Sequence, residues 1–239
     1  MRERHLGFAG AAGPALPLEF AGLSLLLDHS GALYLPAEAT LVVADLHLEK
    51  ASCLARGGQF LPPYDSEATL LRLAATIGRY QPRRIIAAGD SFHDATGFQR
   101  LSARAASLLA ALASQREFLW IRGNHDPLAP SGLVGGAADS LKLGPVWLRH
   151  APEAGSDEPQ ICGHFHPVAR LGARGLKLRK RCFAFNDRVL ILPAFGALTG
   201  GLNVRDPALE PWLGSEFSVC VPGARQVFPA HVSSCLSGP

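Results

Sequence analysis

The amino-acid sequence predicts an α/β fold in which two β-sheets pack against each other. In the first half, apolar runs typical of buried strands alternate with helical segments, and in the second half short strands are separated by Gly, Pro and Asn. Apolar residues make up 48% of the 239 residues, which is enough for a sizeable core. We expect a single domain over residues 1–239, because the best candidate for a linker, Pro152–Pro159, is short for that purpose.

Three apolar runs and two helical segments define the first half. Thr40–Asp45 is continuously apolar, as a strand buried on both faces should be, and Arg83–Asp90 and Glu117–Asn124 repeat this pattern. Asp65–Tyr80 has apolar residues at spacings of 3 and 4 and begins with an Asp or Ser cap, which predicts a helix, and Gly97–Gln115 reads the same way. This β-α-β-α-β order favours a sheet with right-handed crossovers.

The second half has a different pattern. No long helix is evident after Gln115, and turn residues recur between short apolar runs. These runs are Pro145–His150, Pro159–His164, Cys182–Asn186, Arg188–Pro193 and Ser215–Pro222. They predict a second, largely antiparallel sheet that packs against the first.

Composition excludes several classes of protein. The five cysteines form no CxxC pair and their number is odd, which argues against a disulfide framework or a thiolate zinc site and favours a reducing cytoplasm. No apolar run approaches the roughly 18 residues of a membrane helix, so we expect no membrane partner. The segment Met1–Phe20 begins with basic residues, but its Gly and Pro content makes a poor signal peptide. The net charge of +3 neither requires nor opposes a polyanionic partner.

Potential metal ligands follow the apolar runs. They are Asp45 and His47; Asp90, His93 and Asp94; Asn124 and His125; His150; and the pair His164 and His166. Taken singly, a histidine is more often a core or surface residue, and Gly-Asn-His is compatible with a simple turn. The pair in "GHFH" is a stronger signal, because alternation along an extended segment would send both imidazoles to one side. Sites form beyond the carboxyl ends of strands in open α/β sheets, so the combination predicts a dinuclear metal site.

The types of these residues indicate the chemistry. Two divalent ions about 3.5–4 Å apart act as a clamp on a phosphoryl group. A mixture of His, Asp and Asn without thiolate suits manganese, iron or zinc, whereas an all-oxygen set would favour magnesium or calcium. We therefore expect two divalent transition metals, with manganese preferred over iron or zinc.

The order of these motifs resembles the calcineurin-like metallophosphoesterases. DxH, GD, GNH with a following acid, a later histidine and GHxH occur in sequence from Asp45 to His166. The resemblance implies a four-layer α/β/β/α sandwich of two mixed sheets flanked by helices. It implies a first metal held by Asp45, His47 and His166, a bridging Asp90, and a second metal held by Asn124, His150 and His164. It also implies that His125 is a catalytic residue that faces the phosphate and assists the leaving group, while Asp126 either supports the ligands or caps the loop.

Residues 20–205 are similar to one branch of that family, the bacterial DNA-ligase-associated phosphoesterases described as DNA damage response endonucleases. Leu41–Leu73 and Leu192–Val204 carry this similarity. It implies DNA or another phosphodiester as the substrate, and a DNA ligase and a helicase of a repair system as partners. The chain departs from the branch at Glu49, where the branch has glycine. The carboxylate either alters the charge of the site or points to solvent.

Two further features bear on the substrate. Ser/Thr protein phosphatases have an arginine near the position of His93, whereas DNA-repair nucleases of the superfamily have a histidine there, so His93 is interpreted as a second catalytic residue of a diesterase. The alternative is a loop residue close to the metals by chance. Ala169–Arg181 contains basic residues and no acid. Its candidate substrate-binding residues are Arg170, Arg174, Lys177, Arg179, Lys180 and Arg181, which either follow a phosphate backbone or form a solvated hairpin face.

Three functions remain open from the sequence. The first is a metal-dependent phosphodiesterase, a nuclease linked to DNA repair. The second is a phosphoesterase or pyrophosphatase acting on a small nucleotide or related metabolite. The third is a non-catalytic metal-binding scaffold, which the complete set of ligand candidates disfavours.

Overall fold

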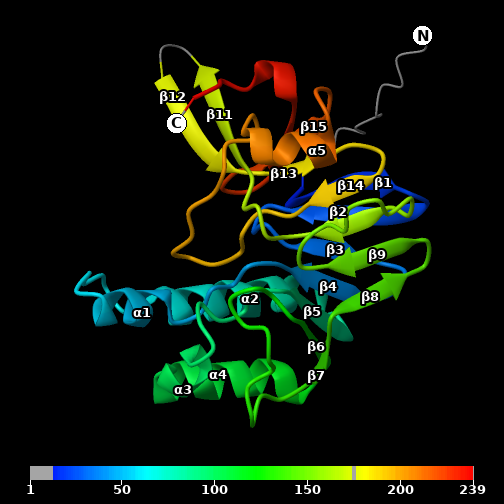
Figure 1. Ribbon diagram of the computed structural model, residues 1–239. Helices are drawn as coiled ribbons and strands as arrows, with labels where there is room; N and C mark the ends of the chain where they lie inside the picture. The colour runs from blue at the N-terminus through cyan, green and yellow to red at the C-terminus, as the bar shows by residue number, and fades with distance from the viewer. Residues whose placement is uncertain (1–12, 174–175, 239) are drawn as a thin grey trace.

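The computed structural model describes residues 13–173 and 176–238 (Figure 1), and the side chains of residues 173–176 are not described. Arg174 and most of the segment considered as a signal peptide therefore lie outside the described residues. None of the helices in the described part of the chain is both long and apolar enough to cross a lipid bilayer.

The first sheet contains the three parallel strands expected from the sequence. Its order is β1-β2-β3-β4-β5-β6-β7, and the neighbours from β4 to β7 run parallel. Its strands are β1 Ala15–Phe20, β2 Leu23–Asp28, β3 Leu33–Leu35, β4 Thr40–Val43, β5 Arg84–Ala88, β6 Glu117–Ile121 and β7 Gly136–Ala138. The antiparallel strands β1–β3 were not predicted, although Leu16, Leu18 and Phe20 alternate with more exposed residues along β1.

The helices α1 Lys50–Arg56, α2 Asp65–Tyr80, α3 Gly97–Arg100 and α4 Ala103–Ser114 cover one face of this sheet (Figure 1). The prediction of α2 is confirmed. The prediction of one helix over Gly97–Gln115 is wrong, because the backbone becomes extended at Leu101 (φ −51°, ψ 132°). Ser102 then begins α4 by accepting a hydrogen bond from the Ala105 N–H through its side chain, which is the usual role of an N-cap serine.

The second sheet has the order β16-β15-β13-β14-β10-β9-β8. Its strands are β8 Ser140–Leu143, β9 Val146–Arg149, β10 Gln160–Cys162, β13 Phe183–Phe185, β14 Val189–Ile191, β15 Ser218–Pro222 and β16 Val227–His231. The expectation of a largely antiparallel sheet needs one correction, because β9, β10 and β14 run parallel and make the sheet mixed. A separate antiparallel hairpin is formed by β11 Val168–Ala173 and β12 Leu176–Arg181. The short helices of this half are η1 Pro207–Leu209, α5 Glu210–Leu213 and η2 Val232–Ser234.

Three apolar clusters create the layers. Side chains such as Leu27, Leu148 and Phe183 fill the space between the two sheets. Leu70 belongs to a second cluster between the first sheet and its helices, and Leu213 belongs to a third on the outer face of the second sheet. Each fully buried side chain of this size contributes about 1.5–3 kcal/mol. The expected arrangement of two mixed sheets flanked by helices is therefore confirmed.

A buried carboxylate joins the first sheet to α2. Asp28 accepts hydrogen bonds from the Ser30 N–H (2.8 Å), the Tyr80 hydroxyl (2.7 Å) and Nη1 of Arg79 (2.7 and 2.8 Å). Burial raises the pKa of Asp28, but the bonds from Ser30, Tyr80 and Arg79 outweigh it, and the net pKa lies below its ordinary value of 3.8. A lowered carboxyl pKa stabilises the fold above the ordinary pKa, and this contribution is lost as the pH falls below it.

We expect Asp28→Asn to lower the free energy of unfolding at pH 7 by about 1.5–3 kcal/mol, the scale of hydrogen bonds to a charged group. Urea denaturation of the variant and the parent protein measures this difference. The gap should narrow as the pH falls below about 4, because Asp28 then takes up a proton more readily in the unfolded chain than in the folded protein. Equal stability of the two proteins at pH 7 would contradict the role given to Asp28.

Candidate metal centre

Loops at the carboxyl ends of the strands bring all seven predicted ligands together. Asp45 and His47 follow β4, Asp90 follows β5, Asn124 follows β6, His150 follows β9, and His164 and His166 follow β10. The first and second sheets thus both contribute to one site. This convergence is the arrangement expected at the carboxyl edge of an α/β sheet.

The backbone of most of these residues is strained. Left-handed φ values occur at Asp45 (54°), His47 (43°), Asp90 (46°), His164 (69°) and His166 (49°). Such conformations cost a non-glycine residue about 1–3 kcal/mol each and cluster at functional sites. The prediction that "GHFH" is an extended segment with both imidazoles on one side is therefore wrong. The left-handed turns direct His164 and His166 into different groups of side chains.

The first cluster consists of Asp45, His47, His166 and one oxygen of Asp90. The Nε2 atoms of His47 and His166 lie 3.1 Å apart, and His166 Nε2 lies 3.4 Å from Asp45 Oδ1. His47 Nε2 lies 3.8 Å from Asp90 Oδ2. One ring nitrogen from each histidine thus faces the carboxylate oxygens of two aspartates.

The second cluster consists of Asn124, His150, His164 and the other oxygen of Asp90. Asn124 Oδ1 lies 2.8 Å from His150 Nε2 and 3.1 Å from His164 Nδ1. His150 Nε2 also lies 3.4 Å from Asp90 Oδ1. Asp90 therefore offers Oδ2 to the first cluster and Oδ1 to the second.

The chemistry of these donors fits divalent cations. Burial, followed by the nearby His166, His125 and His93, lowers the pKa of His47 to about 2, and burial also lowers the pKa of His164. Neutral imidazoles present lone pairs, and lone pairs on nitrogens about 3 Å apart need a cation or a proton between them. His150 Nδ1 lies 3.4 Å from the Ala88 carbonyl oxygen, which is suited to hold the ring with Nε2 toward the cluster.

Glycines of the motifs provide room for the ligands. A Cβ at Gly123 would lie 2.1 Å from Asp90 Oδ1, and a Cβ at Gly163 would lie 2.4 Å from Asp45 Oδ2. Glycine is thus required at position 123 because Asp90 packs closely against its backbone. The sequence context had suggested a different reason, the formation of a turn.

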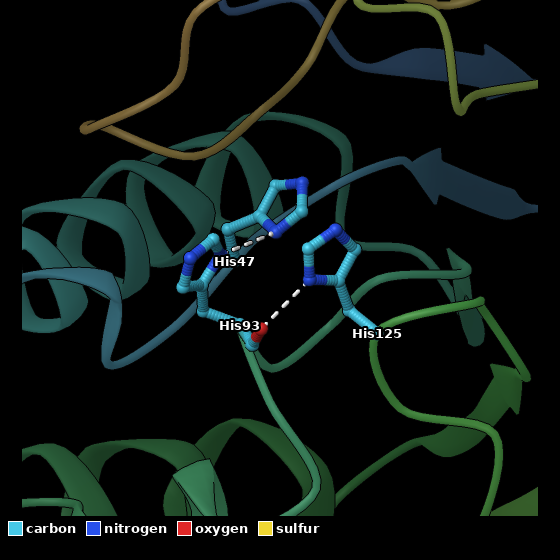
Figure 2. A group of neighbouring side chains, drawn as sticks. All are labelled: His47, His93 and His125. Carbon is cyan, nitrogen blue, oxygen red and sulfur yellow. Dashed lines mark hydrogen bonds between the residues drawn. The ribbon is translucent and has the colours of Figure 1, made fainter. Parts of the chain in front are cut away.

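Two of the nine histidines of the chain, His93 and His125, lie beside His47 (Figure 2) and belong to neither cluster. His125 Nδ1 donates to the His93 carbonyl oxygen (2.8 Å), which leaves Nε2 available, 4.0 Å from Asp90 Oδ2. The His125 side chain is 37% exposed, so part of its ring is accessible from solvent. The arrangement suits an imidazole that meets a substrate.

His93 contacts the predicted ligand His47. Its Nδ1 lies 3.2 Å from Nδ1 of His47, and its ring stacks on that of His125 at a centroid distance of 5.0 Å (Figure 2). Burial and the charge of Lys50 lower the pKa of His93. The three rings of His47, His93 and His125 are close enough to hold a further cation. This group contains no carboxylate, and His47 already belongs to the first cluster, so the group fits a divalent cation less well than the two clusters that share Asp90.

Asp126 caps the loop rather than facing the clusters. Its Oδ2 accepts hydrogen bonds from the backbone N–H groups of Ser91 (2.8 Å) and Phe92 (3.1 Å), and its Oδ1 accepts one from Gly123 (3.1 Å). Burial raises the pKa of Asp126 to about 6 in spite of these bonds. The carboxylate therefore ties the loop after β5 to the loop after β6.

Glu49 is buried, which rules out the second of the two alternatives, that its carboxylate points to solvent. The Ser66 hydroxyl donates a hydrogen bond to Oε1 of Glu49 (2.8 Å), and Oγ of Ser66 accepts one from the Glu49 backbone N–H (2.8 Å). The residue has a left-handed φ of 65° at the start of α1, a conformation that glycine adopts without strain. The bond to Ser66 accounts for a glutamate in this position.

Sequence reasoning missed Lys50 and misjudged Asp94. The charge of Lys50 contributes to lowering the pKa of His47 and of His93, so its ammonium group lies near these two histidines. Asp94 was a ligand candidate, but its carboxylate pairs with Arg100 (2.6 Å) and braces the loop that carries His93. A lysine at the start of a helix has no distinctive sequence signal.

The predicted substrate-binding residues take different positions. Lys177, Arg179 and Lys180 are exposed on β12, and Arg170 is partly exposed on β11. Arg181 is largely turned inward and its Nη1 donates to the Ala194 carbonyl oxygen (3.2 Å). Their role toward a substrate stays a prediction.

A comparison of the sequence with known protein families agrees with the fold and with the two clusters. Residues 39–196 match the sequence model of the calcineurin-like phosphoesterase family, and the chain belongs to this family. It is accordingly a hydrolase that acts on phosphoesters, with candidate sites for divalent metals.

Solved structures include similar proteins. The nuclease MPE of Pseudomonas putida is 30% identical over 90% of this chain and 100% of its own, with a TM-score of 0.70. The phosphoesterase Yfce of E. coli is 14% identical over 82% of this chain and 98% of its own, with a TM-score of 0.42. A predicted phosphoesterase of Streptococcus pneumoniae is 12% identical over 83% of this chain and 91% of its own, with a TM-score of 0.30. No curated protein matches the chain by sequence.

Proposed function

We propose that this protein is a dinuclear metal-dependent phosphodiesterase that cleaves DNA. One observation carries the proposal: Asp90 directs one carboxylate oxygen into each of two clusters, which contain imidazole nitrogens together with the Asp45 carboxylate or the Asn124 amide. A shared carboxylate between two such clusters is suited to hold two cations side by side. The 30% identity to a nuclease supports the choice of a nucleic acid as substrate.

One ion would be held by Asp45, His47 and His166, and the other by Asn124, His150 and His164. Asp90 would contact both ions. When bound, two divalent ions supply positive charge for the phosphoryl group and make water a better nucleophile at neutral pH. Mixed nitrogen and oxygen donors support manganese, iron or zinc, and manganese is the proposed native metal.

His125 would act on the leaving group. Its Nδ1 proton is committed to the His93 carbonyl oxygen, so a proton for the substrate must come from Nε2. The bond to His93 fixes the ring, and the stacked His93 imidazole restricts its rotation. His93 in turn contacts the proposed ligand His47 through Nδ1, and we assign it a positioning role in addition to the predicted catalytic one.

A role in DNA repair, with a DNA ligase and a helicase as partners, follows from the sequence resemblance and is part of the proposal. The five cysteines are free thiols, which supports a reducing cytoplasm as the proposed location. The complete donor set opposes a non-catalytic scaffold. No observation in the site favours a small nucleotide over DNA, and the experiment below separates these substrates.

We expect the manganese-loaded protein to hydrolyse bis-(p-nitrophenyl) phosphate with a higher kcat/KM than p-nitrophenyl phosphate. The reason is that His93 lies where a protein phosphatase would have an arginine to hold a monoester dianion. Single-stranded and duplex DNA complete the panel, with small nucleotides as competitors. Turnover of monoesters alone would reject the diesterase assignment, and diester turnover without DNA cleavage would favour the small-nucleotide alternative.

A further inference from the structure

The β11–β12 hairpin carries a row of basic side chains on one face. Arg170 lies directly opposite Arg179 in the antiparallel register, and Lys177 lies two residues beyond Arg179 on the same strand. Residues two apart on a strand share a face, and cross-strand partners share it too. These three side chains therefore form one cationic surface.

Beneath this surface is a groove. A cavity of about 370 Å³ lies between the hairpin, residues 201–207 and Gly238, and Arg170, Arg179 and Arg205 line it. Asp206 is the acidic residue in the lining, and its Oδ1 already accepts a hydrogen bond from the Ala208 N–H (3.0 Å). In the described part of the chain, no carboxylate forms an ion pair with any of the three arginines. The groove is thus positively charged and not neutralised from within.

The groove adjoins the metal centre. Arg179 Nη2 donates to the Gly201 carbonyl oxygen (2.7 Å), and Gly201 packs so tightly on the ligand His166 that a Cβ would lie 2.1 Å from the His166 oxygen. Arg181 lies on the same face of the hairpin as Arg179 and donates a hydrogen bond to the carbonyl oxygen of Ala194. In Figure 1 the loop between β14 and η1, which contains Gly201, descends from the second sheet toward α1 on the side of the hairpin. Gly201 therefore lines the groove and also contacts the backbone of His166.

The chemistry of the lining indicates the kind of ligand. Guanidinium groups bind phosphates through several N–H donors, and a row of them suits a chain of phosphates better than a single one. None of the described residues lining the groove is aromatic, so nothing there would stack on a base. The occupant suited to this surface is a backbone, recognised without regard to sequence.

We propose that this groove binds the sugar-phosphate backbone of a polynucleotide as it leaves the metal centre. The inference rests on the proposed phosphodiesterase function and adds to it a reason for preferring a polymer over a small diester. A short substrate would occupy the metal centre alone, whereas a strand of several nucleotides would extend over Arg170 and Lys177.

The test compares the double variant Arg170→Glu/Lys177→Glu with the parent protein, both loaded with manganese. Arg83→Glu is the matched control, because Arg83 is exposed at the amino end of β5, the opposite end from the metal centre. Fluorescence anisotropy with a labelled single-stranded phosphorothioate oligonucleotide measures binding without turnover. Hydrolysis of bis-(p-nitrophenyl) phosphate by the same preparations measures the activity of the metal centre on a substrate too small to extend into the groove.

We expect the double variant to bind the oligonucleotide at least about tenfold more weakly than the parent protein. A plot of the logarithm of the association constant against the logarithm of the salt concentration should become less steep by about 1.4, or about 0.7 for each lost phosphate contact. Hydrolysis of the small diester should remain at the parent level. Oligonucleotide binding equal to the parent, or an equal loss in Arg83→Glu, would overturn the proposal. A failure of the parent to hydrolyse the small diester would instead reject the proposed function and leave the binding comparison intact.

Discussion

Asp90→Asn is expected to reduce hydrolysis of every phosphodiester by at least about 10³-fold, because losing the shared charge removes several kcal/mol of charge stabilisation. Each carboxylate oxygen of Asp90 faces a different cluster, so one substitution weakens both. Steady-state rates with bis-(p-nitrophenyl) phosphate, measured with excess manganese, determine the size of the loss.

Asp157→Asn provides the matched control for this change. Asp157 is fully exposed and pairs with Arg188, away from both clusters, so its substitution should leave the rate unchanged. Thermal unfolding shows whether either variant is misfolded. A folded Asp90→Asn protein with the parent rate would show that Asp90 does not hold the catalytic metals.

His125→Ala is expected to lower kcat by about 10²–10⁴-fold on DNA, the usual contribution of general acid catalysis. Metal content should not change, since His125 Nδ1 donates to the His93 carbonyl oxygen and neither ring nitrogen belongs to a cluster. Aryl diesters have good leaving groups that need little proton donation, so the defect should be much smaller on bis-(p-nitrophenyl) phosphate. Parallel assays with the two substrates measure this contrast.

The comparison variant for His125 is His150→Ala, which removes a ligand instead of a proton donor. His150 Nε2 lies within 2.8 Å of Asn124 Oδ1, so its loss should lower metal occupancy first and activity as a consequence. Raising the manganese concentration should restore part of the activity of His150→Ala and none of the activity of His125→Ala. Loss of metal from His125→Ala, or cleavage of DNA at the parent rate, would refute the role assigned to that histidine.

Local signals explain the parts of the fold that could be predicted from sequence. Strands β4 and β5 are buried on both faces and read as unbroken apolar runs, and α2 has an amphipathic pattern long enough to be unambiguous. The convergence of the predicted ligands at one edge could be foreseen because each follows such a run, in an order that few folds share. Their division into two clusters around Asp90 agrees with the roles that the family resemblance implies.

The remainder depends on contacts between distant segments. The left-handed turns at His47 and His166 carry no local signal in a non-glycine residue, because the surrounding fold imposes them. Glu49 could not be placed from sequence because its buried position depends on Ser66. Arg181 looked like its basic neighbours, but the loop that contains Ala194 engages it. The break at Ser102 did have a signal, since serine before an apolar helical run is a typical N-cap.

The most direct test of the dinuclear assignment is a count of metal ions. Protein reconstituted with manganese and freed of excess metal should contain close to two ions per chain by elemental analysis, because the donors form two clusters. The Asp90→Asn variant treated in the same way should lose most of both. One ion or none in the parent protein, or two ions retained by Asp90→Asn, would contradict a dinuclear centre bridged by Asp90.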